Sequence, residues 1–275
     1  MTITEMGARA KEAARVLATA GALKEAALLH AAHALWSRRE EILAANAQDL
    51  EAGKGAGLSQ ALLDRLALTE GRIQDMKTAV EEVAKAADPV GRVLSGETRP
   101  NGLRIEKVAV PLGVIGIIYE ARPNVTSDAA ALCLKAGNAV ILRGGKEAIR
   151  SNKAVAGVLR DALEEAGLPA DCVQLVEDTS RQSAQELMGL TQYLDVLIPR
   201  GGAGLIRSVK ENARVPVIET GVGNCHVYVD ASADLDMAAE IIYNAKCSRP
   251  SVCNAIETIL VHQDAAKAAL PKIKA

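Results

Sequence analysis

Residues 107–146, which read KVAVPLGVIGIIYEARPNVTSDAAALCLKAGNAVILRGGK, decide the fold. Val114–Tyr119 and Ala139–Leu142 are short apolar runs rich in β-branched residues, which favour strands, and Ser127–Lys135 between them carries helix-favouring residues. A strand that is apolar on both faces has to be covered on both faces, as in a parallel sheet between layers of helices. The stretch therefore predicts one strand, helix, strand unit of an α/β fold.

A basic, glycine-rich turn, Arg143-Gly144-Gly145-Lys146, follows the second of these strands. Open α/β sheets bind anionic ligands at the carboxyl ends of parallel strands, just before the next helix. The turn is therefore a candidate site for a phosphate-bearing ligand.

The same alternation continues after this turn. Three further apolar runs predict strands of the same sheet, with the helices Glu147–Glu165, Ser180–Leu190 and Leu205–Asn212 placed among them: Val173–Val176, Asp195–Ile198 and Val215–Ile218. Strands that alternate with helices are typical of a doubly wound, mostly parallel sheet.

A second glycine turn, RGGAG at Arg200–Gly204, stands between a predicted strand and a predicted helix. It departs from the G-x-G-x-x-G pattern of dinucleotide-binding turns. Two interpretations stay open, a phosphate-binding turn that contains Gly201, Gly202 and Gly204, and a tight entry into the helix.

The N-terminal part is predicted to be helical over Thr4–Ala52, Leu58–Leu68 and Thr69–Ala87, with a glycine break at 53–59 and Ser59 as a helix cap. Leu103–Val110 alternates polar and apolar residues, as a half-exposed strand does. We interpret this strand as part of a protruding ribbon near 91–111.

Beyond Glu219-Thr220-Gly221 the pattern predicts a strand at Val227–Val229 and a helix at Leu235–Asn244. An irregular segment, Ala245–Asn254, comes next. A strand at Ala255–Val261 and a final helical run complete the predicted elements.

Composition excludes several classes of function. The chain has 275 residues, 49% hydrophobic and 24% charged, with a formal net charge of −2 and only 2% aromatic residues. These values fit a globular protein and leave neither a basic field nor stacking platforms for nucleic acid. No apolar run has membrane-spanning length, and no N-terminal signal sequence is evident. Neither a nucleic-acid nor a membrane partner is predicted.

The five cysteines are odd in number and lack C-x-x-C spacing, which argues against a disulfide framework and favours a reducing cytoplasm. His30 and His33 have no suitably spaced third ligand, so no metal site is predicted. Cys133 and Cys172 lie in apolar surroundings and are interpreted as inert core residues. Cys253 instead follows two cations, Lys246 and Arg249, in the predicted irregular segment, and nearby cations favour a reactive thiolate.

The order of these parts resembles the aldehyde dehydrogenase superfamily: two glycine turns, then Glu-Thr-Gly, then a cysteine before E-T-I-L-V-H. Within it, the chain is more closely similar to the γ-glutamyl phosphate reductase family, also called glutamate-5-semialdehyde dehydrogenases. The stretches that carry this resemblance are ARPNVTSDAAALCLKAGNAVILRGGKEA (121–148), GLSQALLDRLALT (57–69), DPVGRV (88–93) and SRPSVCNAIETILVH (248–262).

The resemblance implies roles for individual residues. Cys253 occupies the position of the nucleophile, and Glu219 matches a glutamate that activates water in hydrolytic relatives and here is either that group or a structural carboxylate. The oxyanion donor falls within 120–124, where Asn124 is the chemically suitable side chain. Arg143 stands where relatives contact the adenosine ribose, and the glycines of the second turn match a cofactor-binding motif. Apart from the resemblance, the positive charges of Lys246 and Arg249 are expected to attract the acyl phosphate, which makes these two residues the predicted substrate-binding cations.

The implied reaction is the NADPH-dependent reduction of L-glutamyl 5-phosphate to L-glutamate 5-semialdehyde in proline biosynthesis, through a thioester on Cys253. NADPH is expected rather than NADH, because Arg143 and Lys146 suit a 2′-phosphate and no acidic residue immediately follows the strand. The resemblance also implies an upstream glutamate kinase and, for a full-length chain, a homo-oligomer.

The implied domains are a nucleotide-binding domain at 1–222 and the beginning of a catalytic domain at 223–275, and the chain is expected to be a truncated family member. Two alternatives stay open. One is a truncated, non-catalytic nucleotide-binding relative, and the other is a different acylating or hydrolytic aldehyde dehydrogenase.

Overall fold

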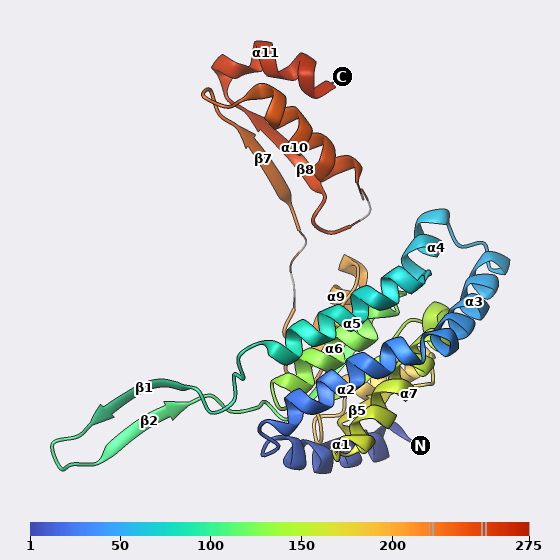
Figure 1. Ribbon diagram of the computed structural model, residues 1–275, viewed down its shortest axis with the longest axis vertical. Helices are drawn as coiled ribbons and strands as arrows, with labels where there is room; N and C mark the ends of the chain where they lie inside the picture. The colour runs from blue at the N-terminus through green and yellow to red at the C-terminus, as the bar shows by residue number, and fades with distance from the viewer. Residues whose placement is uncertain (220, 222, 249, 251, 275) are drawn as a thin grey trace. The chain divides into compact units, whose positions relative to one another are not determined.

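The computed structural model of the chain describes residues 1–219, 221, 223–248, 250 and 252–274. The chain divides into two compact units, Met1–Thr220 and Gly221–Ala275, each with its own helices and strands. Figure 1 shows the first unit in blue to orange and the second in orange to red.

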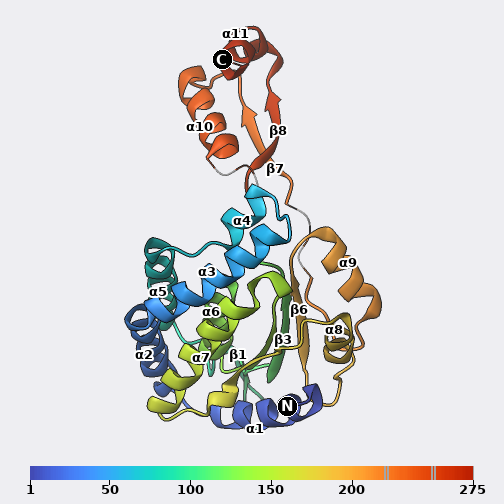
Figure 2. The ribbon, with the colours of Figure 1, turned by 90° about the vertical axis from the view of Figure 1, so that its right-hand side faces the viewer.

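The first unit is built on a parallel sheet of four strands in the order β5-β4-β3-β6. Figure 2 labels β3 and β6, which are neighbours in this sheet. Its strands are β3 (Val114–Tyr119), β4 (Ala139–Arg143), β5 (Val173–Leu175) and β6 (Val196–Arg200). The chain runs outward from β3 to β4 and β5 and then returns to place β6 on the other side of β3. The direction of winding therefore reverses between β3 and β6, where ligands of such sheets bind. The predicted doubly wound parallel sheet is confirmed.

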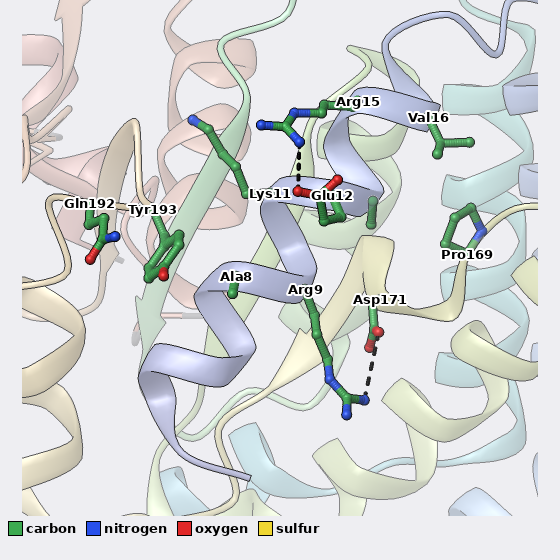
Figure 3. Close-up of a pocket in the computed structure, with 11 residues that line it drawn as sticks. Ala8, Arg9, Lys11, Glu12, Arg15, Val16, Pro169, Asp171, Gln192 and Tyr193 are labelled. Atoms are coloured by element: carbon green, nitrogen blue, oxygen red, sulfur yellow. Dashed lines mark hydrogen bonds and ion pairs between the residues drawn. The ribbon is translucent and has the colours of Figure 1, made fainter.

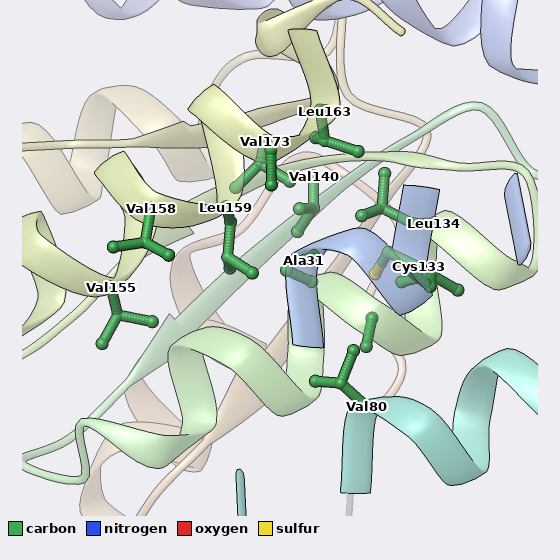
Figure 4. Packing of buried hydrophobic residues seen from close by; sticks show 14 of the residues in the cluster. Ala31, Val80, Cys133, Leu134, Val140, Val155, Val158, Leu159, Leu163 and Val173 are labelled. Atoms are coloured by element: carbon green, nitrogen blue, oxygen red, sulfur yellow. The ribbon is translucent and has the colours of Figure 1, made fainter. Parts of the chain in front are cut away.

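Helices cover both faces of this sheet because its central strand is apolar on both sides. All six residues of β3 are buried. Ile115, Ile117 and Tyr119 belong to one core cluster, which includes residues of α2, α5, α6 and α7, whereas Val114 and Ile118 belong to a second, which includes residues of α1, α8 and α9. Figure 4 shows packing in the first cluster. The bounds of the helices are α1 (Ile3–Leu17), α2 (Leu23–Ser37), α3 (Arg39–Gly55), α4 (Gln60–Leu66), α5 (Glu70–Lys85), α6 (Asn124–Lys135), α7 (Ile149–Glu165), α8 (Arg181–Met188) and α9 (Ala203–Asn212). Two short 3₁₀ turns are η1 (Lys146–Ala148) and η2 (Ala170–Cys172).

The N-terminal helices follow the predicted pattern, with one difference. Ser59 caps α4 as predicted, because its side chain accepts a hydrogen bond from the Leu62 amide. The predicted break at Gly53 is wrong, since α3 continues to Gly55. A Cβ atom on Gly53 would lie 2.9 Å from Leu58 Cδ1, so this glycine allows a close approach of the following segment within a continuous helix.

The predicted ribbon is an antiparallel hairpin of β1 (Val93–Thr98) and β2 (Arg104–Val108). Every residue of both strands is exposed. The hairpin extends away from the helices in Figure 1.

The predicted strand at Val215–Ile218 is wrong as a strand of the sheet. This segment makes one isolated parallel bridge, between Leu197 and Val217, in which the Leu197 amide donates to Pro216 O and the Ile218 amide to Leu197 O. Pro216 has no amide hydrogen, so the segment cannot continue an ordinary ladder there. It lies along β6 without becoming a fifth strand.

The second unit consists of β7 (Cys225–Val229) and β8 (Ile256–Val261), which pair in parallel, together with α10 (Leu235–Cys247) and α11 (Gln263–Lys274). A small core of Val229, Ile242, Ile256 and Ala269 joins them. The predicted irregular segment begins too early at Ala245, because α10 continues to Cys247. Alanine, lysine and a final cysteine extend the amphipathic helix without a breaking residue.

Among the described residues of both units, no helix combines the length and the apolar character that a membrane span needs.

Candidate active site

Three segments meet at the carboxyl edge of the sheet in the first unit. Glu120 directly follows β3, Gly144 and Gly145 follow β4, and Gly201 and Gly202 follow β6 and precede α9. The Glu120 amide donates a hydrogen bond of 3.3 Å to Arg200 O, which ties the ends of β3 and β6 together. The two glycine turns that the sequence singled out therefore flank one residue, Glu120.

The first glycine turn is closely packed. Gly144 is buried, and a Cβ atom there would overlap the side-chain nitrogen of Asn152 and lie 3.1 Å from Tyr119 Cζ. A Cβ atom on Gly145 would lie 3.3 Å from the Ala121 amide nitrogen. These two glycines let the turn approach the end of β3, so their immediate role is backbone packing.

The buried side chains under this turn form a polar chain. Tyr119 and Thr126 share a hydrogen bond of 2.7 Å, and the Thr126 hydroxyl donates to Asn152 Oδ1 at 3.1 Å. Burial raises the pKa of the Tyr119 hydroxyl above its usual range. These hydrogen bonds fix the Asn152 side-chain amide beneath Gly144. The amide therefore cannot easily move to make room for a larger residue at position 144.

The second glycine turn is covered differently. A Cβ atom on Gly201 would lie 2.7 Å from Glu120 Cδ and 2.8 Å from Leu205 Cδ2, whereas one on Gly204 would meet no atom within 4 Å. Gly202 is the N-cap residue of α9, and no side chain of a described residue caps the first turn of that helix. The amide groups of this turn carry the partial positive charge that attracts anions.

Arg143 is held at the end of β4 by the loop before α8. Its Nη2 donates to Thr179 O at 2.8 Å and to Ser180 O at 2.9 Å. Burial lowers the pKa of the Arg143 guanidinium from its usual value, and the charges of Asp178 and Glu147 oppose this shift. Lys146, in η1, is exposed.

Arg143 also lines a pocket of about 430 Å³ between α8 and α9. Its lining combines apolar residues, two arginines and several polar side chains: Ile118, Arg143, Arg181, Ala184, Gln185, Met188, Leu205, Ser208, Val209 and Asn212. An apolar cleft with a few polar and basic groups at a winding reversal is typical of a nucleotide pocket.

A larger pocket of about 730 Å³ lies beside α1, at the opposite edge of the sheet (Figure 3). Pro169 and Asp171 in its wall precede β5, and Tyr193 precedes β6, so this is the amino edge. Its cations are paired with carboxylates, since Arg15 contacts Glu12 at 2.6 Å and Arg9 contacts Asp171 at 4.0 Å. It is therefore a poorer anion site than the smaller pocket.

Asn124 and Glu219, two of the three predicted catalytic residues, belong to the first unit. Asn124 is the first residue of α6, and its Nδ2 donates to Asp128 Oδ2 at 2.9 Å. Burial raises the pKa of the Asp128 carboxyl, and the hydrogen bonds from Asn124 and Ser127 oppose the shift. Glu219 forms an ion pair of 2.5 Å with Lys210 of α9. The side chains of Asn124 and Glu219 are thus each bound to a helical residue, Asp128 of α6 and Lys210 of α9.

Cys253 belongs to the second unit and is exposed in a turn before β8. The strand begins at Ile256, one residue later than the predicted Ala255, so two residues separate it from Cys253. A Cβ atom on Gly223 would lie 2.6 Å from Cys253 O, and the Cys225 thiol lies 3.7 Å from the same oxygen. The segment before β7 therefore braces the turn that carries the thiol.

Lys246 and Arg249 were predicted to lie near this thiol. The Lys246 ammonium donates to Ile256 O at 2.9 Å and lies 4.0 Å from a Glu257 carboxylate oxygen, so it ties α10 to the start of β8. Arg249 lies outside the described residues. Cys247 falls within the predicted irregular segment 245–254, but it is the exposed last residue of α10.

Cys133 and Cys172 are buried, which confirms that they are core residues. Burial raises the pKa of each thiol to about 12, so neither carries a significant thiolate fraction near neutral pH.

Comparison with known proteins identifies the family. The model of the aldehyde dehydrogenase family matches residues 1–275, the whole chain. The chain belongs to the aldehyde dehydrogenase family. The γ-glutamyl phosphate reductase of Moorella thermoacetica is 61% identical over 276 residues, a match that covers 100% of this chain and 66% of that protein. The corresponding protein of Heliobacterium modesticaldum is 60% identical over 97% of this chain and 64% of its own length.

Solved structures agree with the fold of this family member. The crystal structure of γ-glutamyl phosphate reductase from Thermotoga maritima matches with a TM-score of 0.90 and 48% identity, covering 98% of this chain and 66% of that one. The Saccharomyces cerevisiae γ-glutamyl phosphate reductase matches with a TM-score of 0.74 and 32% identity, covering 100% of this chain and 70% of that one. The chain spans just under two thirds of the length of the first relatives it matches.

Sequence reasoning missed several residues of the carboxyl edge. Arg181 and Gln185 of α8 and Ser208 of α9 line the smaller pocket, but polar residues on a helix carry no local signal that distinguishes a pocket from a solvated face. Glu120 was noted only as part of the segment 120–124. Glu120 lies over Gly201, which is 81 positions further along the chain, and no local sequence pattern reveals such a contact.

Proposed function

We propose that this chain carries the cofactor-binding part and the nucleophile of an NADPH-dependent reductase of L-glutamyl 5-phosphate. The observation that carries the proposal is the carboxyl edge of the sheet, where two glycine turns and a pocket with two arginines meet at the winding reversal. The substrate is inferred from relatives that are 61% and 60% identical and are named γ-glutamyl phosphate reductases.

The residues at this edge fit a dinucleotide. Gly201 and Gly202 would leave backbone amides of α9 accessible for a diphosphate once the exposed Glu120 side chain that lies over both glycines changes rotamer. Arg143 and Arg181 would bind the phosphate on the adenosine ribose from the wall of the pocket. The exposed Lys146 adds a third cation near the end of β4, which supports a preference for NADPH over NADH.

Cys253 would perform the covalent step. Its thiolate attacks the acyl carbon of glutamyl phosphate, a carbon–sulfur bond forms, and the bond to the phosphate oxygen breaks with release of inorganic phosphate. Bound NADPH supplies the hydride that reduces the resulting thioester. The thiohemiacetal oxyanion on Cys253 then re-forms its carbonyl group and breaks its carbon–sulfur bond, which releases glutamate 5-semialdehyde and restores the thiolate.

The other predicted site residues would support this chemistry. Asn124 is the proposed oxyanion donor, which requires its amide to turn from Asp128 toward the substrate. Glu219 is proposed as a structural carboxylate, because its pairing with Lys210 disfavours activation of water that would hydrolyse the thioester. Lys246 would position the turn of Cys253 through Ile256, and Arg249 would attract the acyl phosphate.

The wider setting follows from this reaction. A kinase that phosphorylates the glutamate side chain has to supply the acyl phosphate, and the aldehyde product leads toward proline. We propose a cytoplasmic enzyme that assembles as a homo-oligomer when it has the full length of its relatives. Residues 223–275 would then be the beginning of its catalytic domain.

The test is phosphate-dependent reduction of NADP⁺ by glutamate 5-semialdehyde. It is run on this chain and on an extension that carries the final third of the Moorella thermoacetica relative. Activity that requires phosphate in the extended chain supports the proposal. NADP⁺ reduction without phosphate would favour a hydrolytic aldehyde dehydrogenase, and NADPH binding without turnover would favour a non-catalytic relative.

Substitution of the thiols tests the nucleophile. In the extended chain, Cys253→Ser lowers turnover by about three orders of magnitude or more, because a serine hydroxyl is hardly ionised at neutral pH. Cys247→Ser is the matched control, and it retains near-normal turnover. Mass spectrometry after mixing with glutamyl phosphate locates the thioester, and an adduct on Cys247 would contradict the assignment.

A further inference from the structure

We propose that Glu120 is a charge gate at the second glycine turn. Its carboxylate covers Gly201 and Gly202, the place where the diphosphate of a dinucleotide has to approach α9, and it moves aside when the ligand binds. This inference rests on the proposed function, since it concerns how the same edge of the sheet accepts NADPH.

The position of Glu120 is fixed by its backbone and not by its side chain. Its amide donates to Arg200 O at 3.3 Å, and its carbonyl carbon would lie 3.5 Å from a Cβ atom on Gly145. The residue is therefore held between both glycine turns. Its side chain lies over the second turn, with Oε1 at 3.6 Å from the place of a Gly202 Cβ atom, and the residue is exposed. An exposed glutamate side chain can change rotamer without moving the sheet.

Helices α8 and α9 begin at the same edge but differ in how their first turns are satisfied. The Ser180 hydroxyl accepts a hydrogen bond from the Ser183 amide at 3.2 Å and so caps α8. The first turn of α9 has no such cap among the described side chains, and the Glu120 carboxylate oxygens lie 3.6 and 3.9 Å from the place of a Cβ atom on Gly202, the N-cap residue. A negative charge is favourable at this end of a helix.

This arrangement makes ligand binding an exchange of anions. The glutamate carboxylate interacts favourably with the N-terminus of α9 before binding, and it repels the incoming diphosphate. Both effects reduce the affinity for a ligand whose phosphates bind at this turn. A ligand that binds only in the pocket between α8 and α9, without phosphates at the turn, is not affected.

Calorimetric titration with NADPH tests the gate in the wild-type chain, in Glu120→Gln and in the matched control Glu211→Gln. Glu211 is an exposed residue of the last turn of α9, so the control removes one negative charge at the other end of that helix. Glu120→Gln is expected to bind NADPH about three- to tenfold more tightly than the wild type at low salt, and the gain should shrink in 1 M NaCl. Adenosine 2′-monophosphate, which lacks the diphosphate, should bind all three proteins equally.

The possible outcomes separate the two claims. Wild-type binding of NADPH with equal or weaker binding by Glu120→Gln would overturn the gate and leave the proposed function standing. A gain in Glu211→Gln as large as that in Glu120→Gln would also overturn it, because the effect would then be one of overall charge. Failure of both wild type and Glu120→Gln to bind NADPH would overturn the proposed function and the gate together.

Discussion

The two glycine turns at the carboxyl edge have similar sequences and different surroundings. Gly144 is enclosed by Tyr119 and Asn152, which are buried and linked through Thr126, whereas Gly201 is approached by the exposed Glu120 side chain and the half-buried Leu205 side chain. A glycine against fixed atoms serves packing, and a glycine against movable atoms leaves its backbone open to a ligand. The second turn is therefore the better candidate for the diphosphate of the cofactor.

Gly144→Ala should have the largest effect on stability. The added methyl group overlaps the Asn152 amide and crowds the Tyr119 ring, and neither side chain can move without breaking the buried hydrogen bonds. We expect the free energy of unfolding to fall by about 2–3 kcal/mol, the cost typical of an overpacked core. Urea denaturation measures it. A loss no larger than that of Gly201→Ala would remove the distinction between the two turns.

Arg143→Ala should mainly affect the cofactor. The guanidinium lines the pocket between α8 and α9, and a 2′-phosphate interacts with cations that a bare ribose does not need. We expect NADPH to bind about tenfold more weakly, a change of roughly 1.4 kcal/mol, while NADH loses less. Titration with both cofactors is the measurement, and Arg15→Ala in the other pocket is the control. Equal losses for NADPH and NADH would contradict the assignment of Arg143 to the phosphate.

Gly201→Ala should weaken NADPH binding and alter stability less than Gly144→Ala. Its methyl group meets the ends of two flexible side chains, which can rotate away at a cost of about 1 kcal/mol or less. The same methyl group occupies the space through which a phosphate approaches the backbone. Unfolding and NADPH titrations on one preparation separate the effects. Unchanged NADPH affinity would show that the ligand does not use this turn.

Gly204→Ala should have the smallest effect. A methyl group there meets no atom within 4 Å, and the residue lies in the first turn of α9. Alanine restricts the unfolded chain more than glycine does, so we expect a gain in unfolding free energy of up to about 0.5 kcal/mol. A clear loss of stability or of NADPH affinity would mean that α9 contacts more than the structure shows.

The sequence predicted the elements whose signal is local. Continuous apolar runs identified β3 and β4, because both faces of those strands are buried. The shorter apolar stretches of β5 and β6 were also predicted, although β5 contains Gln174 and β6 ends on the exposed Arg200. The same reasoning failed at Val215–Ile218, which is apolar but contains Pro216 and makes a single bridge. It also ended α10 too early, at Asn244, although Pro250 is a local stop signal that fits the observed end at Cys247.

Site residues were predictable where a motif marks them and not where the fold brings distant residues together. The glycine turns and Cys253 could be singled out from their neighbours in the chain. Three other contacts depend on the directions in which side chains point. Glu120 lies over Gly201, Glu219 pairs with Lys210, and Lys246 donates a hydrogen bond to Ile256 O. Those contacts decide whether a charge is available to a ligand, and they require the structure.

Hydrogen exchange with and without NADPH tests the central claim most directly, because it reports where on the chain the cofactor binds. The account predicts that NADPH protects peptides that cover residues 118–122, 143–148 and 201–209, at the ends of β3, β4 and β6. Peptides from the pocket beside α1, at residues 8–16 and 169–171, should exchange unchanged. Protection confined to those latter peptides would contradict the assignment of the carboxyl edge as the cofactor site.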